Sequence, residues 1–385
     1  MSTVLVLAPD AGGTGSVSGV VRNHVRQLAR EHEVVLVSAT VPAEAIPGVR
    51  FHPVGAPGFH WLRRFGHVPR EMALVRALWR EARRVCRRQR AALLMVHSHA
   101  LGAWAGRRAQ ARFRVPFLLV VHGDIHDRPP GTYDARLTAF YRWVTPIAYR
   151  SADRVLAISQ DVAEAATRHG ADPSRVRVVP NGIAPEEIGL SAAEDKRPPL
   201  PDIPLRLLFV GRLSIEKGVA DLLAACALLL RREVPFALDI AGDGPLRARL
   251  ERQAVELGLG ERVRFLGAQS RSRLGALYQG AHITCVPSLS EPQGIVVLES
   301  LIAGVPVVAS DVGGIPDMVR DGENGVLHAP GNPEQIAERI AALAADRDAL
   351  ARLARAAKPS VAERFSWNRT GRALLDIVGE LEAAA

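Results

Sequence analysis

Short apolar stretches alternate with longer stretches of helical periodicity along the first half of the chain. The apolar stretches are VLVLAP, EVVLVSA, ALLMVHSH, PFLLVVHG, RVLAIS and VRVVPNG, at residues 4–9, 33–39, 92–99, 116–123, 154–159 and 176–182. Segments of helix length, such as VSGVVRNHVRQLAREH, separate them. Continuous apolar strands between helices are typical of a parallel sheet that is covered on both faces. The first half is therefore predicted to be an α/β domain, residues 1–183.

The alternation stops at residues 184–204 and then starts again. This stretch, APEEIGLSAAEDKRPPLPDIP, gathers prolines and acidic residues and has no apolar period, so it predicts a linker. The strands predicted after it are residues 205–211, 236–242, 263–267, 282–288 and 305–310, and an amphipathic helix is predicted at 366–385. We therefore expect a second doubly wound α/β domain at 205–365, with a ligand cleft between the two domains.

Length and composition fit two globular domains. The chain has 385 residues, of which 48% are hydrophobic, and a single core usually stops growing at about 250–300 residues. No apolar run approaches the roughly 18 residues of a membrane span, and the start MSTVLVLAPD lacks the basic region of a signal peptide, so we expect a cytoplasmic protein. Cys86, Cys226 and Cys285 are isolated, which fits a reducing compartment and argues against disulfides and structural zinc.

Positive charge is concentrated in the first half of the chain. Residues 1–190 carry 26 Arg and 15 acidic residues, whereas residues 191–385 carry 23 basic and 25 acidic residues. This imbalance indicates an anionic partner for the first half. Lysine is rare, with Lys196, Lys217 and Lys358 the three in the chain. A lysine inside a motif, such as Lys217, is therefore less readily explained by chance.

Two candidate phosphate-binding motifs follow predicted strands, where open α/β sheets place their ligands. APDAGGTGSVSG is rich in glycine, but Gly13, Gly15 and Gly19 miss the GxGxxG spacing of a dinucleotide site, so a ligand loop and a plain turn both remain open. In FVGRLSIEKG, Arg212 and Lys217 directly follow a buried strand. Two cations in that position suit a diphosphate, and solvated surface cations are the alternative.

Two glutamates mark a third motif. HITCVPSLSEPQGIVVLES predicts a strand, a loop and a helix that starts near Gly294, with Glu291 in the loop and Glu299 inside the helix. Carboxylates accept hydrogen bonds from sugar hydroxyls, so the pair offers two acceptors around a ligand whose phosphates lie at the helix start. The alternative is an acid favoured by the helix dipole at Glu291 and a solvated helix face at Glu299. That alternative fits Glu299 poorly, because its neighbours are apolar and an unpaired buried carboxylate is costly.

Taken together, these motifs resemble one protein family. GRLSIEKG, the E-x7-E of Glu291 and Glu299, AGVPVVAS, DVGGIPDMV and DGENGVL are similar to the C-terminal half of the family 4 retaining glycosyltransferases of the GT-B fold. In the first half, the glycine-rich loop, VVHGD and VVPNGI resemble that family's landmarks. The resemblance covers the whole chain and is most specific from Phe209 to Leu327. It implies two Rossmann-like domains that face each other across a cleft, with the C-terminal helix packing back toward the first domain.

The resemblance implies roles for the candidate residues of the second half. Arg212 and Lys217 would neutralise the diphosphate of a nucleotide sugar, Glu299 would bind the ribose hydroxyls, and Glu291 would face the hydroxyls of the transferred sugar. Backbone N–H groups that would meet the phosphate and sugar lie at Gly294, Ile295 and Val296.

In the first half, the resemblance implies that Gly13 approaches the reaction centre and that His122 reaches the donor sugar. From the residues alone, His122 is as well explained by a packed position in the core. The candidate catalytic residues are then Glu291, His122, Arg212 and Lys217.

The motif departs from the family pattern at two positions. Gln293 stands where the aromatic residue of E-P-F-G is usual, and Asp317 stands where the glutamate of GG-x-x-E is usual. Both lie near the expected sugar subsite, so the sugar stays open, with a UDP-sugar favoured and GDP-mannose as the other candidate. Cleavage of the anomeric bond leaves a negative diphosphate, which Arg212, Lys217 and the helix start would stabilise. No D-x-D motif or His/Asp ligand cluster stands out, so no metal cofactor is expected; front-face attack and a covalent intermediate both remain open.

A basic segment, WLRRFGHVPREMALVRALWREARRVCRRQR, occupies residues 61–90. Its apolar residues Trp61, Phe65, Leu74, Leu78 and Trp79 interleave with arginines, and the candidate membrane contacts are Arg83, Arg84, Arg87 and Arg88. Such a segment can bind an anionic membrane surface. An ordinary surface helix with its apolar side on the sheet is the alternative. Nucleic acid is not expected as a partner, because no recognition motif accompanies the charge.

The function expected from the sequence is therefore retaining transfer of a hexose-type sugar from a nucleotide-diphosphate sugar to a lipid-linked, saccharide or polyol acceptor. A soluble natural-product acceptor is the alternative. Other hypotheses are a sugar-nucleotide epimerase, a catalytically silent scaffold or binding protein, and, least favoured, an NAD-dependent dehydrogenase. The oligomeric state stays open.

Overall fold

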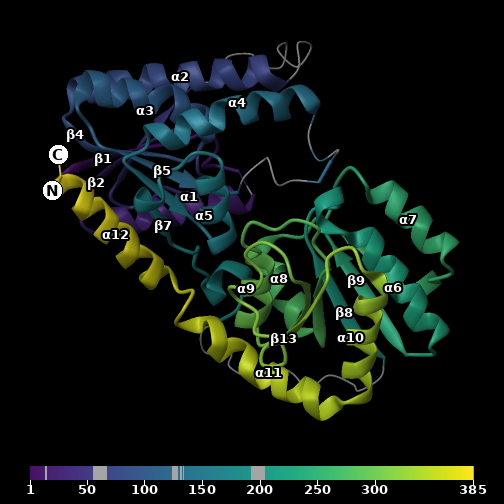
Figure 1. Cartoon of the computed structure of the whole chain (residues 1–385). Coiled ribbons are helices and arrows are strands. Elements are labelled where there is room, and N and C mark those ends of the chain that lie inside the picture. The colour runs from purple at the N-terminus through teal and green to yellow at the C-terminus, as the bar shows by residue number, and fades with distance from the viewer. Residues whose placement is uncertain are drawn as a thin grey trace. The chain divides into compact units, whose positions relative to one another are not determined.

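The chain folds into two compact units (Figure 1). This computed structural model describes residues 1–13, 15–54, 67–123, 129–130, 132, 134–191 and 204–384. The first unit contains Met1–Asp127, Tyr133–Asn181 and Trp367–Ala385, and the second contains Arg128–Thr132 and Gly182–Ser366.

A parallel sheet lies at the centre of the first unit. Its described strands are β1 (Thr3–Ala8), β2 (Glu33–Ser38), β3 (Val49–Pro53), β4 (Ala91–Val96), β5 (Phe117–Val121), β6 (Arg154–Ala157) and β7 (Val176–Val178), in the order β3-β2-β1-β4-β5-β6-β7. Its described helices are α1 (Ser16–Leu28), α2 (His67–Arg88), α3 (His99–Phe113), α4 (Ala135–Ser151), α5 (Gln160–Arg168) and α12 (Trp367–Ala383). Figure 1 shows α2, α3 and α4 on one side of this sheet and α1 and α12 on the other. This double cover explains why the central strands are buried along almost their whole length.

A second parallel sheet lies at the centre of the second unit. Its described strands are β8 (Leu205–Val210), β9 (Phe236–Ala241), β10 (Val263–Gly267), β11 (Ile283–Val286), β12 (Val307–Ser310) and β13 (Gly325–His328), in the order β10-β9-β8-β11-β12-β13. Its described helices are α6 (Val219–Arg231), α7 (Arg247–Glu256), α8 (Arg271–Gln279), α9 (Ile295–Ile302), α10 (Pro333–Ala345) and α11 (Arg347–Ala362), with short 3-10 helices η3 (Pro185–Ile188), η4 (Ile215–Lys217) and η5 (Gly260–Arg262). The strand order changes direction between β8 and β11. Parallel sheets bind their ligands at such a point, beyond the carboxyl ends of the strands.

The two sheets confirm the predicted α/β class with two Rossmann-like domains. Each strand expected from an apolar run is present, with ends that differ by a few residues. The sequence analysis missed β3 and β13, which lie at sheet edges. Their burial is incomplete, because an edge strand needs less apolar surface than a central one. All three cysteines are free, and Cys226 and Cys285 are buried.

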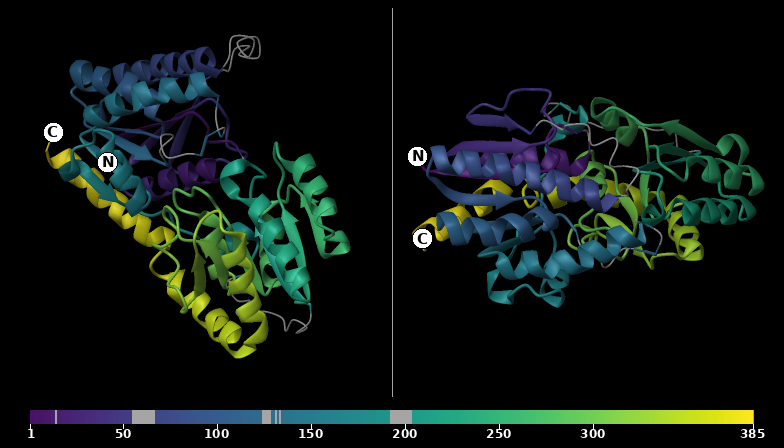
Figure 2. Two further views of the ribbon diagram at one scale, coloured as in Figure 1. Left: turned by 45° about the vertical axis from the view of Figure 1, so that its right-hand side comes forward. Right: turned by 90° about the horizontal axis from the view of Figure 1, so that it is seen from above.

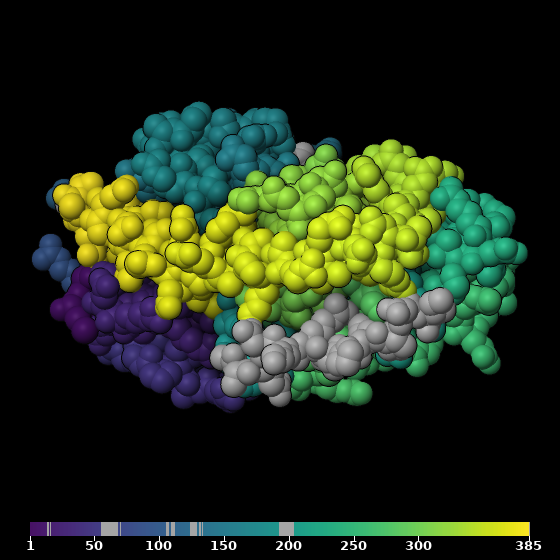
Figure 3. All heavy atoms as spheres, turned by 90° about the horizontal axis from the view of Figure 1, so that it is seen from below, coloured from purple at the N-terminus to yellow at the C-terminus, as the bar shows by residue number. Residues whose placement is uncertain are grey.

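The last helix, α12, belongs to the first unit. Its buried side chains Leu374, Ile377, Val378 and Leu381 join the apolar core of that unit. The two chain ends lie together (Figure 2), and the Ser2 hydroxyl donates to Glu382 Oε1 over 2.6 Å. Seen from below in Figure 3, α12 lies on the surface of this unit next to the N-terminal segment.

The chain passes into the second unit after Asn181 and returns after Ser366. On the second-unit side of both crossings, the Ile183 N–H donates to the Phe365 carbonyl over 2.8 Å. Of the linker expected at 184–204, the structure describes residues 184–191 and Pro204. Within it, Ile188 and Leu190 are buried in a core cluster of the second unit, so this part packs as an integral element.

Candidate functional site

Two loops at the carboxyl ends of β8 and β11 are joined in the second unit. The Leu289 N–H donates to the Glu216 carbonyl over 2.8 Å, which ties the loop after β11 to η4. Gly218 ends η4 with φ +63°, and a Cβ there would lie 1.9 Å from the Pro287 carbonyl oxygen. Glycine is required for this close approach. The predicted motif around Lys217 is thereby fixed against the loop that carries Glu291.

Lys217 and Glu291 form an ion pair at this junction. The Lys217 Nζ lies 2.5 Å from Glu291 Oε2, and their side chains are 22% and 10% exposed. The Ser288 hydroxyl donates to the same carboxylate oxygen over 3.3 Å. The sequence analysis gave the two residues separate partners, the diphosphate and the sugar. The structure also brings the two side chains into direct contact with each other.

The helix α9 begins shortly after Glu291 in the chain. Gly294 adopts a left-handed conformation, φ +92°, and no side chain caps the helix. The N–H groups of the first turn, at Ile295 and Val296, are therefore left without a side-chain acceptor, as in anion-binding helix starts. Arg212, after β8, makes no side-chain hydrogen bond or ion pair with any residue that the structure describes, and its charge stays available to a ligand.

The loop before α9 is held in place from the other side. The Gly314 N–H donates to the Glu291 carbonyl over 3.0 Å. Gly313 has φ +58°, and a Cβ at this position would lie 1.9 Å from that carbonyl oxygen. The predicted DVGGIPDMV motif thus positions Glu291 through the backbone. In the same region, Gln293 is buried, and the Asp317 carbonyl accepts a bond from Arg364.

Glu299 lies in a separate environment from Glu291. It is 3% exposed, its Oε2 accepts from the Tyr278 hydroxyl over 2.8 Å, and its Oε1 lies 3.0 Å from Arg271 Nη2. Burial raises the pKa of Glu299, while Arg271 and Tyr278 act in the opposite direction. The alternative of a solvated helix face at Glu299 is therefore wrong. The sequence analysis missed both partners, because arginine and tyrosine in RSRLGALYQ follow the pattern of an ordinary amphipathic helix.

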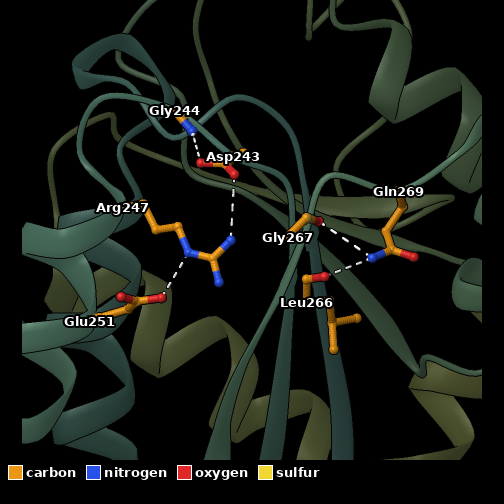
Figure 4. A network of polar contacts seen from close by, with 7 residues as sticks. All are labelled: Asp243, Gly244, Arg247, Glu251, Leu266, Gly267 and Gln269. Atoms are coloured by element: carbon orange, nitrogen blue, oxygen red, sulfur yellow. Dashed lines mark hydrogen bonds and ion pairs between the residues drawn. The ribbon is translucent and has the colours of Figure 1, made fainter.

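A group of polar contacts lies at the carboxyl ends of β9 and β10 (Figure 4). Arg247 Nε donates to Glu251 over 2.8 Å and its Nη1 lies 3.5 Å from Asp243. The Gln269 amide donates to the carbonyl of Leu266 over 2.7 Å. In the sheet, β9 is the neighbour of β8, and β10 lies on the other side of β9.

The glycine-rich loop of the first unit is organised by Asp10. The Asp10 carboxylate accepts bonds from the Gly13 N–H and the hydroxyls of Ser18 and Thr40. Burial acts to raise the pKa of Asp10, but these bonds outweigh it and lower the pKa. Gly13, which the resemblance placed at the reaction centre, therefore has its N–H bound within the loop in this structure.

His122 in the first unit is one of three histidines in contact. Its Nε2 lies 2.9 Å from Nδ1 of His97, with the rings stacked, and the ring centroids of His97 and His24 are 5.5 Å apart. His24 is fully buried, and among the described residues neither of its ring nitrogens has a hydrogen-bond partner. Burial lowers the pKa of all three, to about 3 for His24 and about 4 for His122. These imidazoles are neutral at physiological pH.

The basic helix α2 packs its apolar side on the first unit. Val75, Leu78, Ala82 and Val85 are buried in the core, and Trp79 packs against it. Insertion into a membrane would need an exposed apolar face, and these side chains are buried in the protein instead. The predicted membrane contacts remain at the surface: Arg84, Arg87 and Arg88 are exposed and Arg83 is half-buried. Arg84 is paired with Glu81 at 2.5 Å, and residues 55–66 lie outside the described residues.

Comparison with known proteins identifies the family. Residues 17–187 match the model "Glycosyltransferase Family 4" and residues 191–359 match "Glycosyl transferases group 1". A D-inositol 3-phosphate glycosyltransferase from Nocardia farcinica is 32% identical over 94% of this chain and 85% of its own length. An uncharacterized glycosyltransferase from Methanocaldococcus jannaschii is 30% identical, covering 74% of each chain. The chain belongs to glycosyltransferase family 4.

Solved structures support the GT-B fold of this glycosyltransferase. Sucrose-phosphate synthase from Thermosynechococcus elongatus matches with a TM-score of 0.85 at 22% identity, covering 100% of both chains. Anabaena HepE in complex with UDP-glucose matches with a TM-score of 0.75 at 20% identity, covering 99% of this chain and 100% of HepE. Across the described residues, no helix is long and apolar enough to cross a membrane. Within the same ranges, no three His, Cys, Asp or Glu side chains are placed to hold a metal ion.

The neutral histidines predict acid sensitivity of the first unit. In the folded state His24 and His122 bind protons at about pH 3 and 4, below the ordinary 6.5. Their contribution to stability is therefore complete above pH 6.5 and is lost as the pH falls from there toward 4, by up to about 1.4 kcal/mol per pH unit for each ring. The described tryptophans, Trp79, Trp104, Trp143 and Trp367, lie in the first unit, so urea unfolding followed by tryptophan fluorescence reports on this unit.

We expect His24→Leu to flatten the decline in unfolding free energy between pH 7 and pH 5. Thr145→Val is the matched control, because Thr145 is fully buried in the same unit and does not titrate. It should keep the wild-type slope even if it shifts the whole curve. An unchanged slope in His24→Leu would show that His24 does not couple folding to pH.

Proposed function

We propose that this glycosyltransferase moves a hexose-type sugar, with retention, from a nucleotide-diphosphate sugar to a saccharide, polyol or lipid-linked acceptor. The observation that carries the proposal is the Lys217–Glu291 ion pair beside the uncapped start of α9, with Arg212 on the neighbouring strand end. A cation, a carboxylate and free N–H groups at one place suit a ligand in which a phosphate is joined to a sugar. We favour a UDP-sugar, because the HepE structures contain UDP, glucose or UDP-glucose.

The proposed mechanism follows from where charge develops. When the anomeric bond breaks, the diphosphate gains negative charge, and Arg212, Lys217 and the α9 N–H groups would stabilise it in place. These cations supply the charge without a metal ion. Glu291 would hold the sugar hydroxyls, and His122 from the first unit would act as a neutral hydrogen-bonding partner of the sugar. The acceptor hydroxyl oxygen would then form its bond to the anomeric carbon on the face from which the diphosphate leaves, and the leaving phosphate would accept the hydroxyl proton. Attack on this face retains the configuration.

The acceptor class rests on two observations. Curated relatives are named D-inositol 3-phosphate glycosyltransferases, which favours a polyol or polyol phosphate. The exposed arginines of α2 favour a lipid-linked acceptor at an anionic membrane surface, to which they would bind by charge alone. A lipid-linked acceptor would place the enzyme at the inner face of the cell membrane.

The leaving-group role predicts that Lys217→Ala and Arg212→Ala each slow transfer by at least about tenfold, because each removes a charge that stabilises the diphosphate. UDP-, GDP- and ADP-sugars should first be compared by donor hydrolysis and thermal shift. Arg231→Ala, exposed at the end of α6, is the charge-matched control and should keep wild-type turnover. Near-normal rates in the Lys217 and Arg212 variants would remove them from the mechanism. If no donor in the panel is hydrolysed or transferred, the chain is a catalytically silent scaffold.

The two glutamates should have different effects because they lie in separate environments. Glu299→Ala should weaken binding of free UDP, whereas Glu291→Ala should leave UDP binding intact and abolish transfer. Calorimetric titration with UDP and a turnover assay on the same samples measure both quantities. Equal losses of UDP affinity in the two variants would contradict a nucleotide role for one and a sugar role for the other.

Membrane binding through α2 predicts uptake on phosphatidylglycerol-rich vesicles but not on neutral ones. Each free arginine contributes on the order of 1 kcal/mol, and added salt should reverse the binding because it screens the charges. Replacing Arg83, Arg84, Arg87 and Arg88 by Gln should abolish sedimentation with the vesicles and preserve donor hydrolysis.

The matched control replaces four exposed arginines of the second unit by Gln, namely Arg231, Arg232, Arg249 and Arg252. This variant loses the same number of positive charges and should still bind the anionic vesicles. If the unmodified protein ignores anionic vesicles at low salt, the acceptor is a soluble saccharide, polyol or natural product.

A further inference from the structure

Both oxygens of the buried Glu299 are contacted from one helix. Arg271 is the first residue of α8 and Tyr278 lies seven positions later, so the two side chains project from the same face of the helix. Arg271 approaches Oε1 at 3.0 Å and the Tyr278 hydroxyl donates to Oε2 at 2.8 Å. One residue of E-x7-E is thus held by a helix outside that motif.

Both contacts favour the charged form of Glu299 against the effect of burial. Desolvation disfavours a buried carboxylate, and a cation at hydrogen-bonding distance offsets that cost. A carboxylate has about four acceptor positions, and the described contacts of Glu299 are those to Arg271 and Tyr278. Two acceptor positions remain, one on each oxygen, which is the number that two neighbouring ribose hydroxyls would need.

Arg271 is itself fixed by the segment that enters the second unit. Its Nε donates to the Glu187 carbonyl over 3.1 Å, and its Nη2 lies 3.7 Å from the Glu187 carboxylate. The backbones are close together here: a Cβ on Gly189 would lie 2.2 Å from the Ser272 carbonyl oxygen, and one on Gly275 would lie 2.7 Å from that of Ile188. The start of α8 therefore has little freedom to move relative to η3.

We propose that Arg271 is a positioning residue for nucleotide recognition, which orients the Glu299 carboxylate toward the ribose hydroxyls. The inference rests on the proposed function, in which Glu299 binds the ribose. Arg271 orients the carboxylate because it contacts Glu299 and is itself held by Glu187. It gives the enzyme its preference for a ribose with both hydroxyls over one that lacks them.

The test compares the Kd of UDP with that of 2′,3′-dideoxy-UDP for the full-length protein by calorimetry. The wild type should bind UDP at least about tenfold more tightly, the value of a hydrogen bond to a charged acceptor. Arg271→Met should weaken UDP binding and bring the ratio of the two constants close to one, because Glu299 loses its orientation. Arg271→Lys keeps the charge without the planar fork and should recover part of the ratio.

Two controls separate this role from a purely structural one. Arg273→Met, two positions along on the exposed side of α8, should keep the wild-type ratio. Glu299→Gln should lose it. If Glu299→Gln loses the ratio and Arg271→Met keeps it, the positioning role is wrong and the ribose role of Glu299 stands. If Glu299→Gln keeps the ratio, the ribose assignment itself fails, and the role of Arg271 fails with it. Circular dichroism checks folding, and Arg271→Lys carries the test if Arg271→Met does not fold.

Discussion

The ion pair between Lys217 and Glu291 is the contact on which the candidate donor site depends. It joins the loop after β8 to the loop after β11, at the place where the strand order of the second sheet changes direction. Backbone contacts that require glycine at positions 218 and 313 hold both loops in this register. A charged pair in a partly buried position is stable when both partners are present, whereas removal of one leaves a charge without compensation. A diphosphate-linked sugar would meet both charges at once, which fits a ligand that carries an anion and hydroxyls on adjacent groups.

Buried ionisable groups in both units also avoid an uncompensated charge, and they do so in two different ways. In the second unit, the buried Glu299 is compensated by a cation and a hydroxyl from α8. In the first unit, burial keeps the three contacting histidines neutral by lowering their pKa values. The lowered pKa of His122 keeps its imidazole neutral, so the ring can donate and accept hydrogen bonds without carrying a charge.

The role of α2 also depends on how its surface is divided. Its apolar stripe stabilises the first unit, and its arginines lie on the outside. Of the described α2 residues, the exposed arginines can meet an anionic surface, so attachment through them would be electrostatic, reversible and sensitive to salt. Such an attachment would bring the enzyme to lipid-linked acceptors without a helix that spans the bilayer.

The sequence by itself determined the fold class, because central strands of a parallel sheet must be apolar along their length and read clearly as strands. The edge strands β3 and β13 were missed, since an edge position carries no such requirement. The sequence also indicated Arg212, Lys217, Glu291 and Glu299 as candidate site residues, because motifs at strand ends are local. Only the tertiary structure decided their partners: Lys217 meets Glu291 across 74 residues, and Arg271 reaches Glu299 from another helix. Contacts between elements that are distant in the chain depend on packing, which no local pattern encodes.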